Sequence, residues 1–245
     1  MPRCVIFLCL LLGLTCAKPQ LAIVIDDLGN SATDCTFFAQ TPVSLNCAVI
    51  PGQSASRVCA NIVKEKGQTL LIHFPWENLG KNPAAHYPIR ITSAMTTENI
   101  REMFTRAFMS VPCADGINNH MGSVLSKNPA AMQKVMTIMA GLPQKKFFLD
   151  SHTSNQTKAY IYAYMYGIST AVNNYFLDGF QNEIYIKKQF GYAVASAEKN
   201  GSAIAICHGN RPVTQRVFQF CISHYNSRVD YVSLQSLVKT RELKE

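Results

Sequence analysis

The sequence has 245 residues, of which 48% are hydrophobic and 16% are charged, with a formal net charge of +8 at pH 7. This length and apolar content are enough for one large domain, or two small ones, with a sizeable core. Few aromatic residues cluster among the Lys and Arg residues, which argues against a dedicated nucleic-acid stripe and favours an anionic envelope or polymer as partner. A solvated basic surface without a partner is the alternative.

The first 17 residues have the pattern of a secretory signal peptide. Arg3 supplies a positive charge, residues 5–14 are almost wholly apolar, and small residues stand where a signal peptidase would cut. The apolar run is shorter than the about 20 residues that span a bilayer, so we expect no stable membrane span after cleavage. An alternative is that this run forms a first core strand. We therefore predict a signal peptide over residues 1–17 and one secreted or periplasmic domain over residues 18–245.

The cysteines fall into two groups. Three of the nine lie in the predicted signal segment: Cys4, Cys9 and Cys16. The remaining six contain no C-x-x-C pair, which argues against a zinc knuckle or a thioredoxin-type redox pair. They are Cys35, Cys47, Cys59, Cys113, Cys207 and Cys221. An even number predicts at least one disulfide in an oxidising compartment, although several of these residues can also be buried as small apolar side chains.

Short apolar runs of strand length alternate with helical patterns along the rest of the chain. Predicted strands cover residues 21–25, 43–49, 69–72, 114–117, 147–149, 169–172, 203–207 and 229–232. Predicted helices cover residues 100–108, behind a cap at Thr97, and residues 132–139, behind Asn128 and Pro129. Seven or eight such repeats predict an α/β fold of the β/α barrel type, with a doubly wound open sheet as the alternative.

Acidic residues and histidines follow the predicted strands. Residues 21–25 end in Asp26 and Asp27, whose side chains we expect on opposite faces because successive strand residues alternate. Other predicted strands are followed by His73, His120, Asp150 and His208. In parallel β/α folds, ligands bind at the carboxyl ends of the strands. A polar turn explains any one of these residues, but five strand ends of this kind are hard to attribute to packing.

Two imidazoles and a carboxylate on three strands suit zinc or another divalent metal ion. Three protein ligands leave a position open for water, as in catalytic zinc sites. We therefore expect Asp27, His73 and His120 to bind the metal. The neighbouring Asp26 is then available as general base, and His208 as the acid for the leaving group.

Five further residues are expected around the metal or the substrate. Trp76, the single tryptophan, can stack on a sugar ring or fill the core. Glu77 can join the site or orient the histidine that precedes it. Asn119, Asp150 and His152 stand beside the proposed ligands or at strand ends.

Five motifs, in this order, resemble the divergent polysaccharide deacetylase family. They are Ile-Asp-Asp-Leu-Gly at 25–29, Leu-Ile-His-Phe-Pro-Trp-Glu at 71–77, Gly-Ile-Asn-Asn-His-Met-Gly-Ser at 116–123, Phe-Leu-Asp-Ser at 148–151 and Gly-Ser-Ala-Ile-Ala-Ile-Cys-His at 201–208. The resemblance implies a distorted β/α barrel of about seven parallel strands with surrounding helices, acting outside the cytoplasm. It matches Asp26 to the general base, Asp27, His73 and His120 to the metal ligands, and His208 to the catalytic acid.

The sequence departs from the family pattern near the expected substrate. Trp76 and Asn78 stand where the family more often has Met and Pro, and His152 stands where arginine is usual. The loop over residues 209–212 is similar to the family loop but one residue longer.

These features predict a secreted metal-dependent amidohydrolase, a carbohydrate deacetylase acting on carbon–nitrogen bonds other than peptide bonds. It would remove N-acetyl or O-acetyl groups from a carbohydrate polymer of the cell envelope or extracellular matrix by attack of metal-bound water. The alternative is a catalytically inactive glycan-binding or scaffold protein with the same fold. A glycosidase using Asp26 with Asp150 or Glu77 is weaker, because it leaves three histidines without a role.

Overall fold

The structure, a computed structural model, describes residues 17–79 and 86–239. Residues 1–16 of the predicted signal peptide lie outside the described residues. The described strands are β1 (Gln20–Leu28), β2 (Asn46–Val49), β3 (Thr69–Trp76), β4 (Gly116–Met121), β5 (Phe147–Asp150), β6 (Thr170–Val172), β7 (Tyr175–Phe176), β8 (Ser202–His208) and β9 (Asp230–Tyr231).

Seven α-helices and two 3-10 helices are described in the same ranges. They are α1 (Ala32–Ala39), α2 (Ser56–Glu65), α3 (Thr97–Ser110), α4 (Pro129–Ala140), α5 (Ala159–Met165), α6 (Glu183–Asn200), α7 (Pro212–Tyr225), η2 (Leu125–Lys127) and η3 (Leu234–Ser236). No helix among these residues is long and apolar enough to cross a bilayer.

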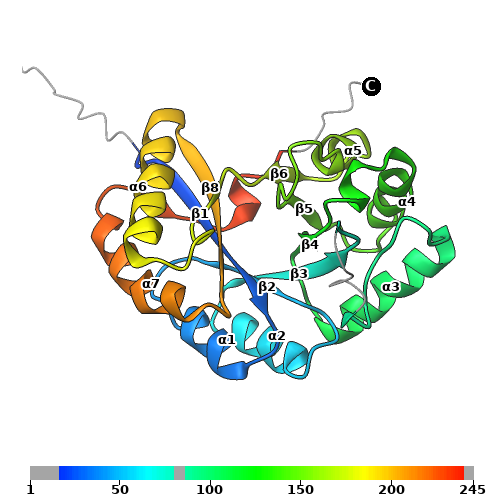
Figure 1. The fold of residues 1–245 in the computed structure, drawn as a ribbon, viewed down its shortest axis with the longest axis horizontal. Helices are drawn as coiled ribbons and strands as arrows, with labels where there is room; N and C mark the ends of the chain where they lie inside the picture. Colours follow the sequence, from blue (N-terminus) through cyan, green and yellow to red (C-terminus); the bar gives the residue numbers. More distant parts are fainter. Residues whose placement is uncertain (1–16, 80–85, 240–245) are drawn as a thin grey trace, which may run out of the picture.

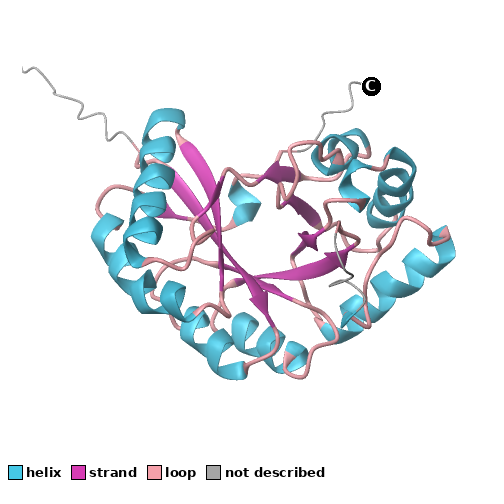
Figure 2. Ribbon diagram, in the orientation of Figure 1, coloured by secondary structure: helices cyan, strands magenta, loops and turns pink. Residues whose placement is uncertain are grey.

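The strands form one curled parallel sheet with the α-helices on its outer side (Figures 1 and 2). Its order is β6-β5-β4-β3-β2-β1-β8-β7, and β9 pairs with the start of β1. β6 and β7 do not pair, so the sheet is an open half-barrel. The chain crosses this gap at Asn173 and Asn174, whose backbone N–H groups donate to Asp150 and Ile204. The predicted distorted β/α barrel of parallel strands is confirmed, although the prediction missed the two-residue β7.

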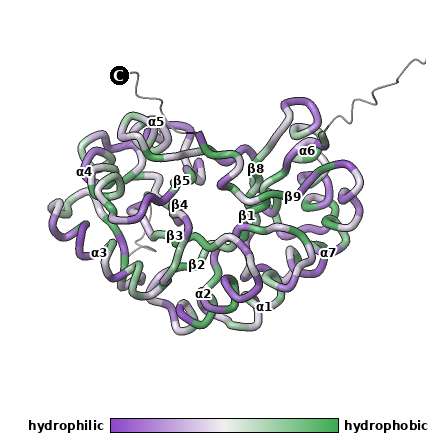
Figure 3. The backbone as a smooth tube through the Cα atoms, turned by 180° about the vertical axis from the view of Figure 1, so that it is seen from behind, coloured by the Kyte–Doolittle hydropathy of each residue, from purple (hydrophilic) through white to green (hydrophobic). Residues whose placement is uncertain are grey.

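Side chains alternate along the strands between two cores. On β1, Leu21, Ile23 and Ile25 pack against the helices. Ala22 and Val24 point into the half-barrel with inward residues of the other strands. Figure 3 shows that β1 and β8 are largely hydrophobic, whereas the outer helices mix hydrophobic and hydrophilic residues.

The C-terminal segment closes the amino-terminal end of the half-barrel. Leu234 of η3 is fully buried among the inward-facing strand residues. Its backbone N–H donates to Asn46 Oδ1 at 2.8 Å, and Asn46 Nδ2 donates to the carbonyls of Ile23 and Val232 at 3.0 and 3.3 Å. One buried amide on β2 therefore fixes this segment in place, and the polar residues at the other end of the strands stand above an apolar interior.

The helix starts follow the side chains that cap them. Asn128 caps α4 through its side chain, which accepts from Ala131 N at 3.1 Å, and Pro129 takes the first helical position as predicted. The cap of α3 is Thr96, whose hydroxyl accepts from Asn99 N at 3.2 Å. The predicted cap, Thr97, is instead the first residue of the helix.

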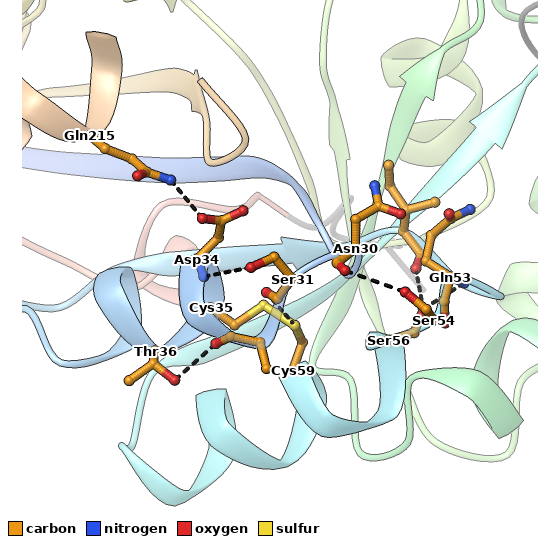
Figure 4. The surroundings of a disulfide bond; sticks show 12 residues. Asn30, Ser31, Asp34, Cys35, Thr36, Gln53, Ser54, Ser56, Cys59 and Gln215 are labelled. Carbon is orange, nitrogen blue, oxygen red and sulfur yellow. Dashed lines mark hydrogen bonds between the residues drawn. A yellow bond between two sulfur atoms is a disulfide. The ribbon is translucent and has the colours of Figure 1, made fainter. Parts of the chain in front are cut away.

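A disulfide joins α1 to α2, with 5.5 Å between the Cα atoms of Cys35 and Cys59 (Figure 4). The predicted presence of at least one disulfide is confirmed. The bond lies beside Ser31, whose hydroxyl accepts from Asp34 N at 3.2 Å and caps α1. Cys47, Cys207 and Cys221 are buried free thiols, and burial raises the pKa of Cys47 to about 12. These three therefore act as small apolar residues.

Removing the disulfide should destabilise the protein measurably. We expect Cys35→Ser/Cys59→Ser to lower the free energy of unfolding by about 3 kcal/mol. The bond joins residues 24 positions apart, and it restricts the unfolded chain by closing that loop. Denaturant unfolding of both proteins measures the difference. The control is Cys113→Ser at an exposed free cysteine, which should change stability by less than about 0.5 kcal/mol. Equal stability of the double variant and the wild type would contradict the assignment.

Candidate metal centre and active site

A pocket of about 360 Å³ opens at the carboxyl end of the strands. Its lining comes from β1, β3, β4 and the ends of β5, β7 and β8: Asp26, Asp27, His73, Asn78, Asn119, His120, Met121, Ser123, Ser151, Thr153, Phe176, His208 and Arg211. A second pocket, of about 400 Å³, lies at the amino-terminal end of β4 to β6. Its single acid, Asp115, is already paired with Lys64 at 3.0 Å, so the ionisable cluster belongs to the first pocket.

A β-bulge places both acids of β1 in this pocket. Between Ile25 and Leu28 the register against β2 slips by one residue, and Asp27 has a left-handed φ of 62°. Asp26 follows the inward-facing row of Ala22 and Val24, whereas regular alternation would turn Asp27 outward. The expectation that the two side chains lie on opposite faces is therefore wrong, because the bulge re-aims Asp27 toward the same site.

Three potential metal ligands converge beside the bulge. Asp27 Oδ1 lies 3.0 Å from His120 Nδ1 and 3.3 Å from His73 Nε2, and the two nitrogens lie 3.0 Å apart. Zinc bound tetrahedrally at its usual bond lengths places its ligands about 3.3 Å apart. Asp27 Oδ1 is buried and accepts no hydrogen bond of normal geometry from the described residues. This carboxylate oxygen and the two imidazole nitrogens that it faces form a donor set that fits a divalent ion.

Asn118 determines which nitrogen of His73 faces this cluster. Its Nδ2 donates to Asp26 Oδ1 at 2.8 Å, which fixes the amide so that Oδ1 points the other way. His73 Nδ1 lies 2.9 Å from Asn118 Oδ1, and only a protonated Nδ1 can form that hydrogen bond. In neutral His73 the lone pair is then on Nε2, beside Asp27. Asn118 therefore links Asp26 to Asp27. Its hydrogen bond to Asp26 fixes the tautomer of His73, and that tautomer directs the lone pair of His73 toward Asp27.

The two neighbouring acids differ in proton affinity. Burial raises the pKa of Asp26 above its ordinary value, against the opposing effects of His73 and His208. Burial would raise the pKa of Asp27 as well, but His120 and His73 hold it below the ordinary value. Asp27 therefore stays ionised, as metal ligation requires, and Asp26 is the better proton acceptor. Burial also lowers the pKa of His120, which keeps this imidazole neutral.

His208, opposite Asp26 on β8, forms a partly buried pair with Asp178. Its Nδ1 lies 2.8 Å from Asp178 Oδ1, and its backbone N–H donates to Asp178 Oδ2 at 2.9 Å. Thr214 at the start of α7 donates to the same carboxylate at 2.7 Å. Burial would lower the pKa of His208, but Asp178 raises it above the ordinary histidine value. The pair therefore favours a protonated His208 that can donate from Nε2.

The structure brings all five residues of the predicted centre into the pocket: Asp26, Asp27, His73, His120 and His208. Asn119 also lines it, but its amide is engaged with Met121 O at 2.7 Å and Ser151 N at 2.9 Å. It contacts the strand ends rather than the predicted ligands.

Trp76 takes the core position that was one of its two predicted roles, not a place beside a sugar, and Glu77 takes neither position predicted for it. Trp76 is 1% exposed and stacks on Phe148 with 5.7 Å between ring centroids, so it has no free face for a sugar. Glu77 accepts from Ser93 N at 2.7 Å, and it anchors the segment around residue 93 instead of orienting His73. The orienting role falls to Asn118.

Asp150 and His152 also lie outside the pocket lining. Asp150 is fully buried and accepts from His152 N, Thr157 Oγ1 and Tyr160 N at 2.9, 2.8 and 3.1 Å. It fixes the turn that leads into α5. His152 is exposed, with a left-handed φ of 58°, and the pocket is lined by its neighbours Ser151 and Thr153.

Sequence reasoning missed Asn118 and Asp178. Asn118 belongs to the Asn-Asn-His run, and its place two residues before His120 puts it on the inward face of β4. Asp178 ends the apolar segment 175–177, the same pattern of strand and acid that marks Asp26. Because β7 has only two residues, that pattern is too short to predict a strand.

Comparisons with known proteins agree with the fold described above. Residues 23–238 match the family described as divergent polysaccharide deacetylase. The uncharacterized protein YibQ of Escherichia coli K12 is 36% identical over 219 residues, 89% of this chain and 67% of that protein. An uncharacterized protein from Agrobacterium tumefaciens C58 has a similar structure, with a TM-score of 0.81 and 19% identity over 91% of both chains. A family 4 carbohydrate esterase from Streptomyces lividans gives a TM-score of 0.51 and 9% identity over 94% of this chain and 100% of its own.

Asn118→Ala tests the tautomer argument. We expect zinc affinity to fall about 10- to 100-fold, because His73 loses the hydrogen bond that holds its lone pair toward Asp27. Competition with a chromogenic chelator measures the affinity. Asn226→Ala, at an exposed residue, is the matched control and should bind zinc like the wild type. An unchanged affinity in Asn118→Ala would contradict the role given to this amide.

Asp178→Asn tests the pair with His208. We expect the pKa of His208, followed by NMR, to fall, because the carboxylate that raises it is removed. The folded-state pKa is raised for His208 and lowered for Asp178. The contribution of protonated His208 to the free energy of unfolding is therefore lost as the pH rises through the folded-state pKa of His208. The contribution of ionised Asp178 is lost as the pH falls through the folded-state pKa of Asp178.

The loss of unfolding free energy in Asp178→Asn should accordingly be largest between about pH 4 and about pH 6.5, where it should reach about 3 kcal/mol. The matched control is Asp230→Asn, at an exposed surface pair with Lys18, which should cost less than about 1 kcal/mol. A pH-independent difference, or an unmoved His208 titration, would contradict the pairing.

Proposed function

The chain belongs to the divergent polysaccharide deacetylase family, and on that premise we propose that it is a metal-dependent hydrolase that removes acetyl groups from a carbohydrate polymer. The observation that supports this most strongly is the convergence of Asp27, His73 and His120 within 3.3 Å of one another, beside a buried acid and opposite a partly buried His–Asp pair. A glycan-binding scaffold without turnover would need neither Asp26 nor the His208–Asp178 pair.

The roles follow from where each group lies. Asp27, His73 and His120 would hold a divalent ion, for which zinc suits the ligand set best. When bound, such an ion acidifies a water molecule and polarises a carbonyl oxygen. Asp26, whose pKa is raised by burial, accepts the proton of the attacking water. His208, kept protonated by Asp178, donates a proton to the departing nitrogen or oxygen of the sugar.

The pocket has one polar wall and one mixed wall. Side chains from the ends of β3 to β5 offer amide and hydroxyl groups: Asn78, Asn119, Ser123, Ser151 and Thr153. On the other side Phe176 lies parallel to the His208 ring, with 6.2 Å between centroids. Because Trp76 is buried, Phe176 is the pocket aromatic available to an acetyl methyl group or the apolar face of a sugar.

An acetylated envelope or matrix polymer is the substrate class that agrees with the rest of the chain. The net charge of +8 favours an anionic polymer, and the pattern of residues 1–17 favours export to the periplasm or beyond. The Streptomyces lividans esterase of similar fold was solved in complex with acetate, the product expected of such a reaction. No role for nucleic acid is proposed.

The function is tested by acetate release from a panel of N-acetylated and O-acetylated amino-sugar oligomers. We expect the zinc-loaded wild type to release acetate, a chelator to stop the reaction and added zinc to restore it. His73→Ala and His120→Ala should each lower zinc affinity by more than about 100-fold and lose activity in parallel, because two remaining ligands hold a catalytic zinc poorly.

Two further variants separate turnover from metal binding. Asp26→Asn and His208→Ala should keep bound zinc and slow acetate release by about 10²- to 10⁴-fold, because they remove a proton acceptor and a proton donor without removing a ligand. Metal content and rate are measured on the same samples. If Asp26→Asn lost zinc while His73→Ala kept it, the assigned roles would be wrong. If zinc-loaded wild type released no acetate from any oligomer, the scaffold alternative would replace the enzyme.

A further inference from the structure

Arg211 brings a fixed positive charge to the pocket. It precedes α7, three residues after His208, and its side chain is 32% exposed. Its Nη1 donates a hydrogen bond to the backbone carbonyl of Asp178. The guanidinium is therefore held at the rim, next to the group that the mechanism uses as acid.

The charge of Arg211 is not neutralised by a hydrogen-bonded carboxylate. Asp178 Oδ1 is 3.6 Å from Nη1, beyond hydrogen-bond distance, and this carboxylate already accepts from His208 and Thr214. Arg216 and Arg228 differ in this respect, because each donates to a glutamate at 2.9 Å or less. Among the arginines of the described residues, Arg211 is thus the one that lines the pocket and is anchored through a carbonyl.

The remaining donors of Arg211 are available to a ligand. Its Nε and Nη2 form no hydrogen bond with the described residues. A guanidinium presents its donors in a planar fork that matches a carboxylate, and a partly exposed fork already held on one side loses little entropy on binding. The facing wall offers neutral amides and hydroxyls. Apart from His208, to which the proposed function gives the role of acid, Arg211 is the cationic side chain of the pocket lining.

We propose that Arg211 recognises a carboxylate carried by the glycan, so that the preferred substrate is an acetamido-sugar polymer with a carboxylate close to the acetylated residue. This inference rests on the proposed function and narrows its substrate class. Arg211 acts as a specificity-determining residue, separate from the groups that hold the metal or move protons. The carboxylate can belong to a lactyl ether on the sugar or to a neighbouring hexuronate, and both place the same anion at the rim.

The test compares carboxylated oligosaccharides with their methyl esters. The first probe is a tetrasaccharide of alternating N-acetylglucosamine and N-acetylmuramic acid, which carries the lactyl carboxylate. The second is a hyaluronan tetrasaccharide, which carries the hexuronate. For each acid and its ester, kcat/KM for acetate release is measured with zinc-loaded protein, and Kd is measured by calorimetry with zinc-loaded Asp26→Asn protein.

At least one acid should be preferred over its ester by about tenfold or more in the wild type. Arg211→Gln should lower kcat/KM and affinity for that acid by about 10- to 100-fold and for the ester by less than about threefold. Arg216→Gln removes the same charge from an exposed position in α7 and is the matched control. It should change neither value by more than about twofold. The acid that shows the preference identifies the source of the carboxylate.

Two outcomes would overturn the proposal. One is the absence of a preference for either acid in the wild type. The other is an equal loss for acid and ester in Arg211→Gln, which would mean that Arg211 acts only by positioning Asp178. The binding measurements separate this proposal from the proposed function. If the protein bound the acid more tightly than its ester but released no acetate, the carboxylate site at Arg211 would stand and the proposed deacetylase activity would be rejected. If it released acetate from acid and ester equally, the activity would stand and the carboxylate site would be rejected.

Discussion

The amide of Asn118 is the constraint on which the site depends. It donates to Asp26 and accepts from His73, so a single buried side chain links the proposed base to a proposed metal ligand. If the amide were rotated, its NH₂ group would face His73 Nδ1, and the lone pair of His73 would turn away from Asp27. The hydrogen bond to the Asp26 carboxylate prevents this, because burying that carboxylate without a donor would cost more than an ordinary lost hydrogen bond. The charge on one acid therefore sets the geometry around the other.

The sheet places the other residues of the site at fixed positions along the strands. Asp26, His73 and His208 continue the inward rows of β1, β3 and β8, directly above apolar side chains of the half-barrel interior. The C-terminal segment, held by Asn46, fills the other end, and the pocket lies at the carboxyl side of the described strands. The disulfide between α1 and α2 lies beside Ser31, in the loop that follows the bulge at Asp27 (Figure 4).

Much of this arrangement could be predicted from the sequence, because strand alternation and strand ends are local properties. The same alternation, counted more strictly, also shows which residues predicted for the site face the helices instead of the pocket. Trp76 shares the parity of Ile72 and Phe74, which face the helices, and Asp150 shares that of Phe148. What the sequence could not supply is the bulge at Asp27, which breaks the parity on which such counting relies. Nor could it supply Asp178, because a two-residue strand carries no periodicity and its pairing with β8 depends on the whole sheet.

X-ray absorption spectroscopy of the zinc-loaded protein is the most direct measurement of the central claim, that the strand ends form a metal centre from a carboxylate and two imidazoles. We expect one zinc per chain with nitrogen and oxygen neighbours at about 2.0–2.1 Å, multiple-scattering features of two imidazoles, and no sulfur neighbour. A sulfur neighbour at about 2.3 Å would place the metal on cysteines instead. Either that result or a zinc with fewer than two imidazoles would contradict the account.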